Sequence, residues 1–107
     1  MADTLSRLDR TIRDRRAADP DSSYVARLFG KGRAKIAQKV GEEAVEAVIA
    51  AMTGDGRGLV SESADLIFHL AVLLAHEGLS FDDVLAELDR REGVSGIAEK
   101  ASRPDQD

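Results

Sequence analysis

The sequence has no cysteine or tryptophan and only one tyrosine, three phenylalanines and two prolines. The absence of cysteine excludes a disulfide framework, a zinc site with thiolate ligands and a cysteine nucleophile. With so few aromatic residues and no sustained alternation of polar and apolar positions, the sequence gives little support for β-strands. The longest apolar stretch, residues 66–75, is interrupted by His69 and is far too short to span a bilayer. We therefore expect an all-α protein without a membrane partner.

The charge balance also excludes some functions. The net charge of −5 argues against a nucleic-acid-binding protein that works through a basic surface. An acidic protein can still bind a polyanion when a metal cation bridges the two. The polar and charged segment 1–16 does not resemble a signal peptide, so we expect a cytoplasmic protein.

A chain of 107 residues is expected to form a single domain, residues 1–107. At this size about 60–70% of the unfolded chain's surface can be buried, so oligomerisation would add usefully to the core. The segment 93–107 has two glycines, a proline and mixed charge, and we expect it to be flexible.

The apolar spacing and the capping residues predict helices joined by short connections. The predicted helical segments are residues 3–17, 24–29, 33–53, 59–77 and 81–92. The glycine-rich run 54–58 is predicted as a turn, and Ser80 as an N-cap with Asp83 in the capping-box position. Short connections between long helices predict an antiparallel bundle of about four helices.

The second long helix, 59–77, is apolar nearly all the way round, which predicts a buried element. At 100° per residue its polar side chains fall within an arc of roughly 60°. They are Glu62, Asp65, His69 and His76. A carboxylate on a buried helix is costly unless it is paired or bound to a cation, and two carboxylates at i and i+3 repel each other.

The first long helix, 33–53, repeats this spacing. Glu43 and Glu46 lie at i and i+3, and Glu42 lies one turn before Glu46. Across an antiparallel pair of helices the two acidic stripes can face each other and concentrate their carboxylates. Carboxylate oxygens suit a hard cation, so the pattern favours magnesium or manganese.

The same residues have a plainer interpretation. On the first long helix the charged arc is about 140° wide and includes Lys35 and Lys39, so this face could simply be solvated. The acidic pair of the second helix, however, has no basic residue on its own stripe, and we therefore favour a metal site. His69 lies one turn after Asp65; a single histidine is more often a core residue than a ligand, so its role stays open.

Several segments of the chain resemble a known family. The run Glu42 to Glu46, followed by Glu62 to Asp65, matches the EExxE…ExxD pattern of the all-α, MazG-like nucleotide pyrophosphohydrolases. More narrowly, the chain is similar to the phosphoribosyl-ATP pyrophosphatase family of histidine biosynthesis. The segments that carry this similarity are 23–28 with Lys31 and Gly32, then 35–43, then 91–97 with 100–103.

The resemblance implies a homodimer that hydrolyses phosphoribosyl-ATP between its α- and β-phosphates, giving phosphoribosyl-AMP and pyrophosphate. It also implies Mg²⁺ as the cofactor, with Mn²⁺ as a substitute. The positions that match the family's magnesium ligands are Glu43, Glu46, Glu62 and Asp65. Glu42 matches a further acidic position that orients or deprotonates water.

Water bound to such a metal has a lowered pKa and is the expected nucleophile, with Glu42 or Glu43 as the proton acceptor. We expect the phosphates to meet basic residues beside or just before the acidic stripe. These are Lys31, Arg33, Lys35 and Lys39. For Lys31 and Lys39 a role as salt-bridge partners is an equal alternative.

Two other functions stay open at this point. One is a housekeeping pyrophosphohydrolase of the same superfamily that acts on free NTPs or dNTPs, and the other is a non-catalytic helical dimerisation module. A di-iron bundle is disfavoured because it needs Glu-x-x-His on two helices, whereas the second pair here is Glu62-x-x-Asp65.

Overall fold

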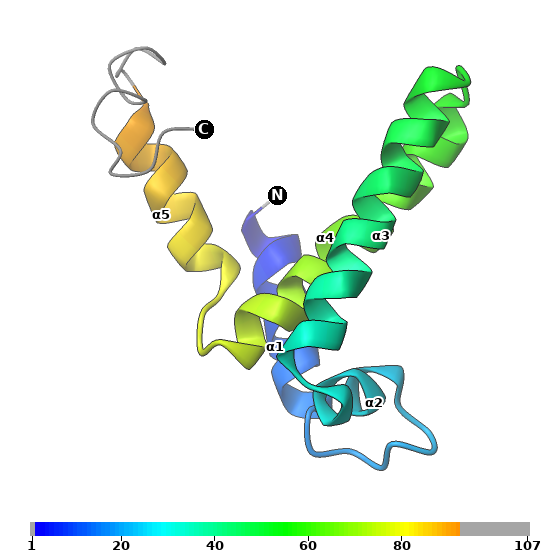
Figure 1. The fold of residues 1–107 in the computed structure, drawn as a ribbon. Helices are drawn as coiled ribbons and strands as arrows, with labels where there is room; N and C mark the ends of the chain where they lie inside the picture. Colours follow the sequence, from blue (N-terminus) through cyan, green and yellow to red (C-terminus); the bar gives the residue numbers. More distant parts are fainter. Residues whose placement is uncertain (1, 93–107) are drawn as a thin grey trace.

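The computed structural model describes residues 2–92, and within them the chain is helical without a strand (Figure 1). The helices are α1 (Ala2–Arg15), α2 (Tyr24–Lys31), α3 (Arg33–Met52), α4 (Gly56–His76) and α5 (Phe81–Arg91). The prediction of an all-α fold is confirmed. The prediction of a flexible segment 93–107 lies outside the described residues.

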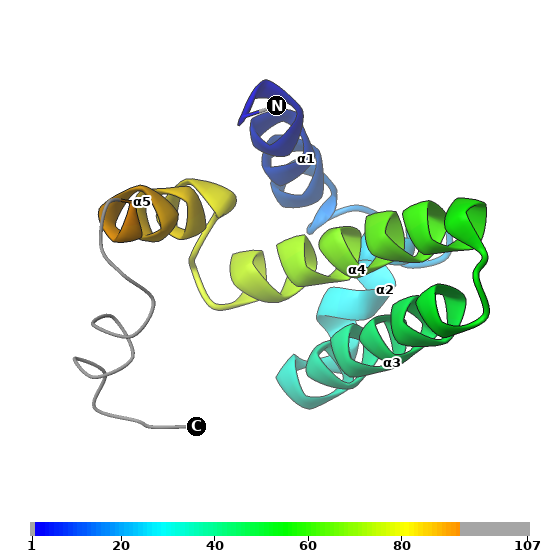
Figure 2. The same ribbon diagram turned by 90° about the horizontal axis from the view of Figure 1, so that it is seen from above.

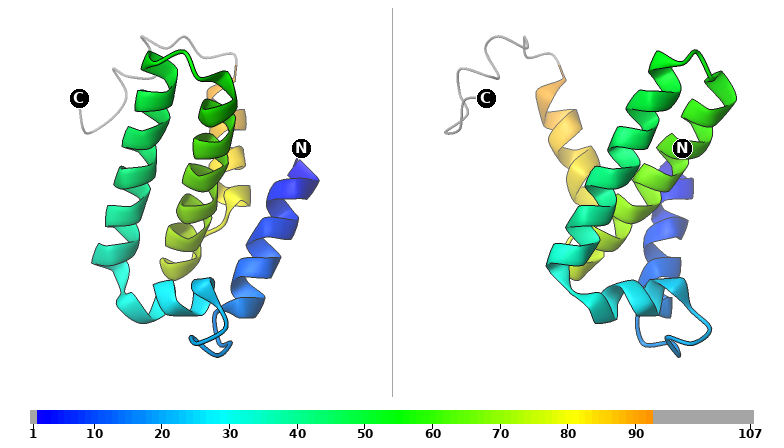
Figure 3. Two further views of the ribbon diagram at one scale, coloured as in Figure 1. Left: turned by 90° about the vertical axis from the view of Figure 1, so that its right-hand side faces the viewer. Right: turned by 45° about the vertical axis from the view of Figure 1, so that its right-hand side comes forward.

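Helices α3 and α4 form an antiparallel hairpin, as the short connection predicted (Figure 3). The turn between them is shorter than the predicted 54–58, because Asp55 caps α4 by accepting a hydrogen bond from the backbone N–H of Gly58 at 2.8 Å. A Cβ atom at Gly58 would collide with the Asp55 carboxylate, so this tight cap requires glycine. Two of the glycines that suggested a loop, Gly56 and Gly58, thus belong to the first turn of the helix, while Gly54 lies in the turn before it.

The core lies at the base of the hairpin, where α1 and α2 cover it. Figure 2 shows α4 lying between α1 and α3. The largest fully buried side chains come one from each of the first four helices: Ile12, Leu28, Ile36 and Val72. Asp9 of α1 is also buried and accepts a hydrogen bond from the backbone N–H of Phe81 at 3.0 Å, which fixes the start of α5. The base is therefore held by contacts from all five helices.

Above this base the molecule opens into a V, with the α3–α4 hairpin as one arm and α5 as the other (Figure 1). Helix α5 packs against α1 and leads away from the hairpin, so α3 and α4 are not enclosed by it. The antiparallel arrangement predicted for a bundle is thus realised in α3 and α4, while α5 diverges.

The prediction that residues 59–77 form a buried helix is wrong for much of α4. Only His69, Ala71 and Val72 are buried there, whereas Val60 is 72% exposed and Ile67 41% exposed. On α3 the exposed apolar side chains recur at i, i+3, i+4 and i+7, and we call them the apolar stripe: Val45, Val48, Ile49 and Met52. The all-round apolar character of α4 reflects a second face that the described part of the chain does not cover.

By length and composition alone, the whole of α4 is also long enough to cross a membrane, which the shorter stretch 66–75 did not suggest. Its packing gives a different explanation. The helix lies against α1, α2 and α3, and it carries Glu62, Asp65 and His69 along one side. These features are those of a helix that packs against others in a folded domain.

Candidate metal centre

The hairpin brings carboxylates from both long helices together. One carboxylate oxygen from each of Glu43, Glu62 and Asp65 lies within 4.8 Å of the other two. We call these three residues the carboxylate cluster. Glu43 comes from α3 and the other two from α4, so the cluster depends on the antiparallel pairing. The facing of two acidic stripes, expected from the spacing, is therefore present in the structure.

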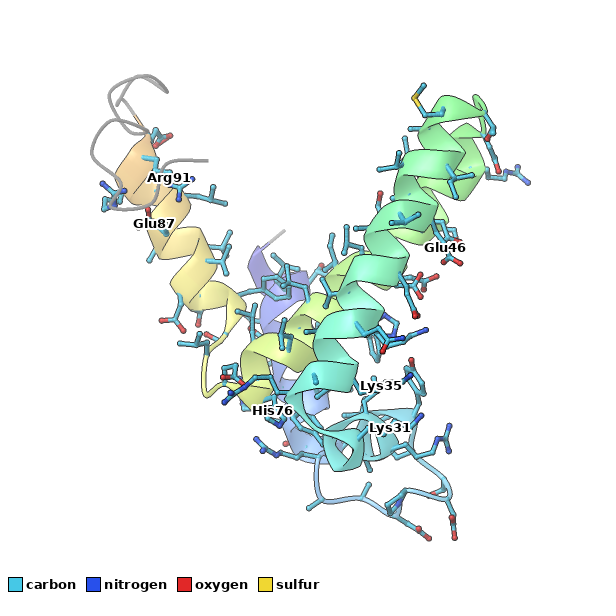
Figure 4. The ribbon with its side chains drawn as sticks, in the orientation of Figure 1. Lys31, Lys35, Glu46, His76, Glu87 and Arg91 are labelled. Atoms are coloured by element: carbon cyan, nitrogen blue, oxygen red, sulfur yellow. The ribbon has the colours of Figure 1, made fainter. Side chains whose placement is uncertain are left out.

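Glu46 extends the cluster toward the tip of the hairpin. It lies one turn after Glu43 on the outer half of α3 (Figure 4). Hydrogen bonds with Glu62 and Glu43 lower the pKa of Glu46, which therefore holds its negative charge among the other carboxyl groups. The structure thus groups all the residues that matched the family's magnesium ligands.

Two oxygens of the cluster are buried without a hydrogen-bond partner, namely Oε2 of Glu43 and Oε2 of Glu62. A buried polar atom without a partner is rare, because its lost hydration is not replaced. Here the unmatched atoms are carboxylate oxygens that lie close to further carboxylate oxygens. A divalent cation with a preference for oxygen ligands is the group that this donor set fits.

The electrostatics of the cluster lead to the same conclusion. The pKa of Glu62 rises to about 7, first through its hydrogen bond with Glu46, then through burial and the negative charges of Glu46, Glu43 and Asp65. Burial also raises the pKa of Glu43, with Glu46 adding to the rise. The chain itself therefore does not neutralise these charges, and near pH 7 a proton competes with any cation for the site.

Lys39 is the basic residue that the structure places beside these acids. Its Nζ lies 3.4 Å from Oε1 of Glu42 and 3.7 Å from Oε1 of Glu43. Glu42 also accepts a hydrogen bond from Gln38 at 2.8 Å, and these contacts with Gln38 and Lys39 lower the pKa of Glu42. Glu42 is exposed and stands beside the cluster rather than within it.

The other basic candidates lie nearer the base of the hairpin (Figure 4). Lys31 and Lys35 are exposed there, and the charge of Lys35 contributes to the lowered pKa of Glu42 after the contacts with Gln38 and Lys39. Arg33 is held away from the carboxylates by Glu77, with its Nε 2.8 Å from Oε2. The structure therefore brings Lys39 to the carboxylates, leaves Lys31 and Lys35 exposed nearer the base, and engages Arg33 elsewhere.

His69, whose role the sequence left open, is a buried residue with both ring nitrogens engaged. Its Nδ1 lies 2.7 Å from the backbone carbonyl oxygen of Asp65, and its Nε2 lies 2.8 Å from the hydroxyl of Tyr24. Sequence reasoning missed Tyr24 as a neighbour of the site, because no helical spacing links residues 24 and 69. The only signal available was its place in a segment that resembles the family.

A groove of about 360 Å³ opens next to the carboxylates, between the outer halves of α3 and α4. Glu46 and Glu62 line one part of it, and Ile49, Ala50 and Thr53 line its α3 side. The groove thus combines a negatively charged portion with an apolar wall, which suits a ligand that carries phosphates bound through a cation and a less polar group.

An all-helical hairpin that gathers carboxylates around buried, unpartnered oxygens defines a protein with a candidate site for divalent cations. The comparison with known families makes this class more specific. Residues 5–92 match the family described as phosphoribosyl-ATP pyrophosphohydrolase, and the chain belongs to that family. The family is part of the MazG-like all-α superfamily, so the resemblance read from the sequence is confirmed.

Curated relatives agree over nearly the full length of the chain. The chain is 69% identical over 104 residues to the phosphoribosyl-ATP pyrophosphatase of Rhizorhabdus wittichii, covering 97% of this chain and 98% of the relative. The protein of the same name from Erythrobacter litoralis is 68% identical over 102 residues, covering 95% and 98%. That from Zymomonas mobilis is 63% identical over 102 residues, covering 95% of each.

Proposed function

We propose that this chain hydrolyses phosphoribosyl-ATP to phosphoribosyl-AMP and pyrophosphate, a step of L-histidine biosynthesis, in the cytoplasm. Family membership and the names of the relatives support the substrate and the reaction. The observation that carries the chemistry is the convergence of Glu43, Glu62 and Asp65 within 4.8 Å, from two helices, with two unpartnered buried oxygens. This donor set is suited to Mg²⁺, with Mn²⁺ as a substitute.

The metal would be held by the carboxylate cluster together with Glu46. When bound, Mg²⁺ supplies positive charge that neutralises the polyphosphate and stabilises the negative charge developing on the leaving pyrophosphate. In the hydrolysis, water adds to a phosphorus of the α–β anhydride, the bridging P–O bond breaks, and one proton of the water passes to a carboxylate.

Two carboxylates are candidates for accepting that proton. Glu43 has a raised pKa and is the stronger base, but it belongs to the carboxylate cluster. Glu42 has a lowered pKa and is the weaker base, but its exposed carboxylate is not tied to the cluster. We propose that Glu42 receives the proton, and that Lys39 between the two acids keeps Glu42 ionised and therefore ready to accept it.

The remaining basic residues would contact the substrate's phosphates. Lys35 and Lys39 lie on the same side of α3 as Glu42, and Lys31 lies at the end of α2. We propose that these lysines engage the phosphate groups and that the groove beside Glu46 accepts part of the nucleoside. Arg33, paired with Glu77, would reach the substrate only after leaving that partner.

We further propose that the chain acts as a homodimer. The apolar stripe of α3 leaves Val48 60% exposed and Met52 81% exposed. An exposed apolar surface of this kind on a soluble domain marks an interaction site. We favour a second copy of this chain as the partner that covers the apolar stripe. Two antiparallel hairpins packed together would form a four-helix bundle, which is a common arrangement for helices of this length.

The function is tested by measuring pyrophosphate release with Mg²⁺ from phosphoribosyl-ATP, ATP and a panel of dNTPs. We expect strong preference for phosphoribosyl-ATP. Glu46→Gln should abolish release, whereas the matched Glu87→Gln on α5 should retain it. Turnover of dNTPs alone would instead favour a housekeeping pyrophosphohydrolase. A folded protein that releases pyrophosphate from none of these substrates would contradict the enzymatic proposal and favour a dimerisation module.

A further inference from the structure

Tyr24 at the start of α2 and His69 in the middle of α4 form a hydrogen-bonded pair at the edge of the carboxylate cluster. The backbone carbonyl of Asp65 can only accept a hydrogen bond, so Nδ1 of His69, at 2.7 Å, carries a proton. In the neutral ring Nε2 then has a lone pair and accepts. In this neutral tautomer the hydroxyl of Tyr24, at 2.8 Å, donates to Nε2.

The rings around this pair hold it in place. The ring of Tyr24 stacks on Phe68, with centroids 6.1 Å apart and an interplanar angle of 19°. The imidazole of His69 meets Tyr24 edge-on at 5.7 Å and Phe68 edge-on at 5.2 Å. These contacts do not require the tyrosine hydroxyl, since a phenylalanine ring would make them equally well. Among the described hydrogen bonds, the hydroxyl of the partly exposed Tyr24 has His69 as its partner.

The position of the imidazole explains why this matters for the site. Asp65 of the carboxylate cluster lies one turn before His69 on α4. On the α3 side, burial and Glu46 raise the pKa of Glu43, and Lys39, with its Nζ 3.7 Å from Oε1 of Glu43, opposes this rise. A freed imidazole nitrogen one turn from Asp65 would offer the cation a nitrogen ligand, and it would favour softer ions such as Ni²⁺ or Zn²⁺ over Mg²⁺.

We propose that Tyr24 is a positioning residue: its hydroxyl engages Nε2 of His69, keeps that lone pair away from the cation, and so preserves an all-oxygen donor set that selects Mg²⁺ over softer divalent ions. The proposal rests on the metal site of the proposed function. The hydrogen bonds to Tyr24 and Asp65 together fix the imidazole, so losing the first frees Nε2 and leaves one bond opposing rotation of the ring.

The test compares the full-length wild type with Tyr24→Phe, which keeps the ring and removes the hydroxyl. Ser22→Ala is the matched control, because it removes an exposed hydroxyl, bonded to the carbonyl of Asp19, outside the cluster. Binding of Mg²⁺ and of Ni²⁺ is measured by calorimetry. In Tyr24→Phe the affinity for Ni²⁺ relative to Mg²⁺ should rise at least about tenfold, the usual size of effects from residues that orient a metal site. Ser22→Ala should leave the ratio unchanged.

A second variant isolates the imidazole. In the double variant Tyr24→Phe/His69→Asn the gain in relative Ni²⁺ affinity should disappear, because the freed nitrogen is absent. Nitrogen NMR of the wild-type imidazole should show the proton on Nδ1 and an accepting Nε2, and Tyr24→Phe should shift the Nε2 resonance.

An unchanged Ni²⁺/Mg²⁺ ratio in Tyr24→Phe, or a wild-type proton on Nε2, would overturn the role of Tyr24. Failure of the proposed metal site gives a different result. The wild type would then bind neither ion, although its imidazole retained the expected hydrogen bonds. That result would overturn the metal site and, with it, the selection of Mg²⁺ by Tyr24.

Discussion

The carboxylates on the two arms of the V have opposite pKa shifts, because their neighbours carry opposite charges. On α5, Glu87 accepts hydrogen bonds from Arg90 at 2.9 and 2.7 Å and from Arg91 at 2.9 Å (Figure 4). These contacts lower the pKa of Glu87 to about 2. On the hairpin, Glu62 faces other acids, and its pKa rises to about 7. One arm neutralises its charge within the chain, whereas the other requires a charge from outside.

Both arms expose apolar side chains, including Leu88 of α5, which is 55% exposed. The hairpin exposes Val48 and Met52 of the apolar stripe, and it carries the carboxylate cluster on the same pair of helices. The arm that is incomplete in both respects is thus the one on which we place the cation, the substrate and the second copy. A surface that combines unneutralised carboxylates with exposed apolar side chains differs in this way from a surface that is only solvated.

The largest effect should appear when two single variants are compared, each of which removes one acid from one arm. Glu62→Gln should lower Mg²⁺-dependent pyrophosphate release by more than about 100-fold, because loss of a ligand exceeds the effect of losing a residue that only orients one. Glu87→Gln should leave the rate unchanged. In the metal-free protein Glu62→Gln should instead raise the melting temperature, since it relieves repulsion among the acids. Equal rates for the two variants would remove the distinction between the arms.

Charging the apolar stripe should come next in size. Val48→Glu places a carboxylate in the proposed dimer interface and should convert the dimer to a monomer at micromolar concentration. Ala34→Glu, at an exposed position near the start of α3, is the matched control. Light scattering after size-exclusion chromatography measures both. A wild-type protein that is monomeric at all concentrations, or a Val48→Glu protein that stays dimeric, would contradict this interface.

Binding of Mg²⁺ should weaken by about tenfold from pH 8 to pH 6, because Glu62 with a pKa of about 7 must lose its proton first. Calorimetry in buffers of different ionisation enthalpy should detect the released proton. Glu62→Gln should abolish this pH dependence of binding, and Glu87→Gln should retain it. A pH-independent affinity in the wild type would place the titrating group elsewhere.

Stability without metal should depend on pH with opposite signs in the two arms. The folded pKa of Glu62 lies above its ordinary value, so the native state binds more protons between about pH 4.5 and 7 and stability falls as the pH rises through that range. Glu87 has a depressed pKa, so its contribution is present above about pH 4.5 and is lost as the pH falls toward 2. Thermal unfolding in EDTA of the wild type, Glu62→Gln and Glu87→Gln separates the two contributions.

The smallest effect concerns the turn that sets the register of the hairpin. Gly58→Ala should lower the free energy of unfolding by about 1–2 kcal/mol, because its methyl group collides with Asp55 and breaks the cap. Gly56→Ala meets open space in the first turn of the same helix and should not destabilise. Urea denaturation compares the two. A Gly56→Ala protein as unstable as Gly58→Ala would show that steric contact with the cap is not the cause.

The sequence predicted the helices well because their apolar spacing and caps are local. It also predicted that acids of 33–53 and 59–77 would face each other, since antiparallel pairing follows from a short connection. The start of α4 was missed, because Gly56 and Gly58 resemble a loop until the Asp55 cap is seen. That cap depends on a backbone approach that only the structure displays.

Other features depended on contacts between distant parts of the chain. The bond between Tyr24 and His69, and the pairing of Arg33 with Glu77, join residues more than 40 positions apart, and no periodic pattern indicates them. The exposure of α4 was misjudged for a related reason. An apolar face indicates that something covers it, but the sequence does not distinguish another helix of the same chain from a second copy.

The most direct test of the central claim is a product analysis of phosphoribosyl-ATP hydrolysis in ¹⁸O-labelled water, with Mg²⁺ and with EDTA. The account predicts phosphoribosyl-AMP and pyrophosphate in equal amounts, one ¹⁸O atom in one of the two, and no products with EDTA or with Glu46→Gln. Release of orthophosphate, or turnover that persists at full rate in EDTA, would contradict it.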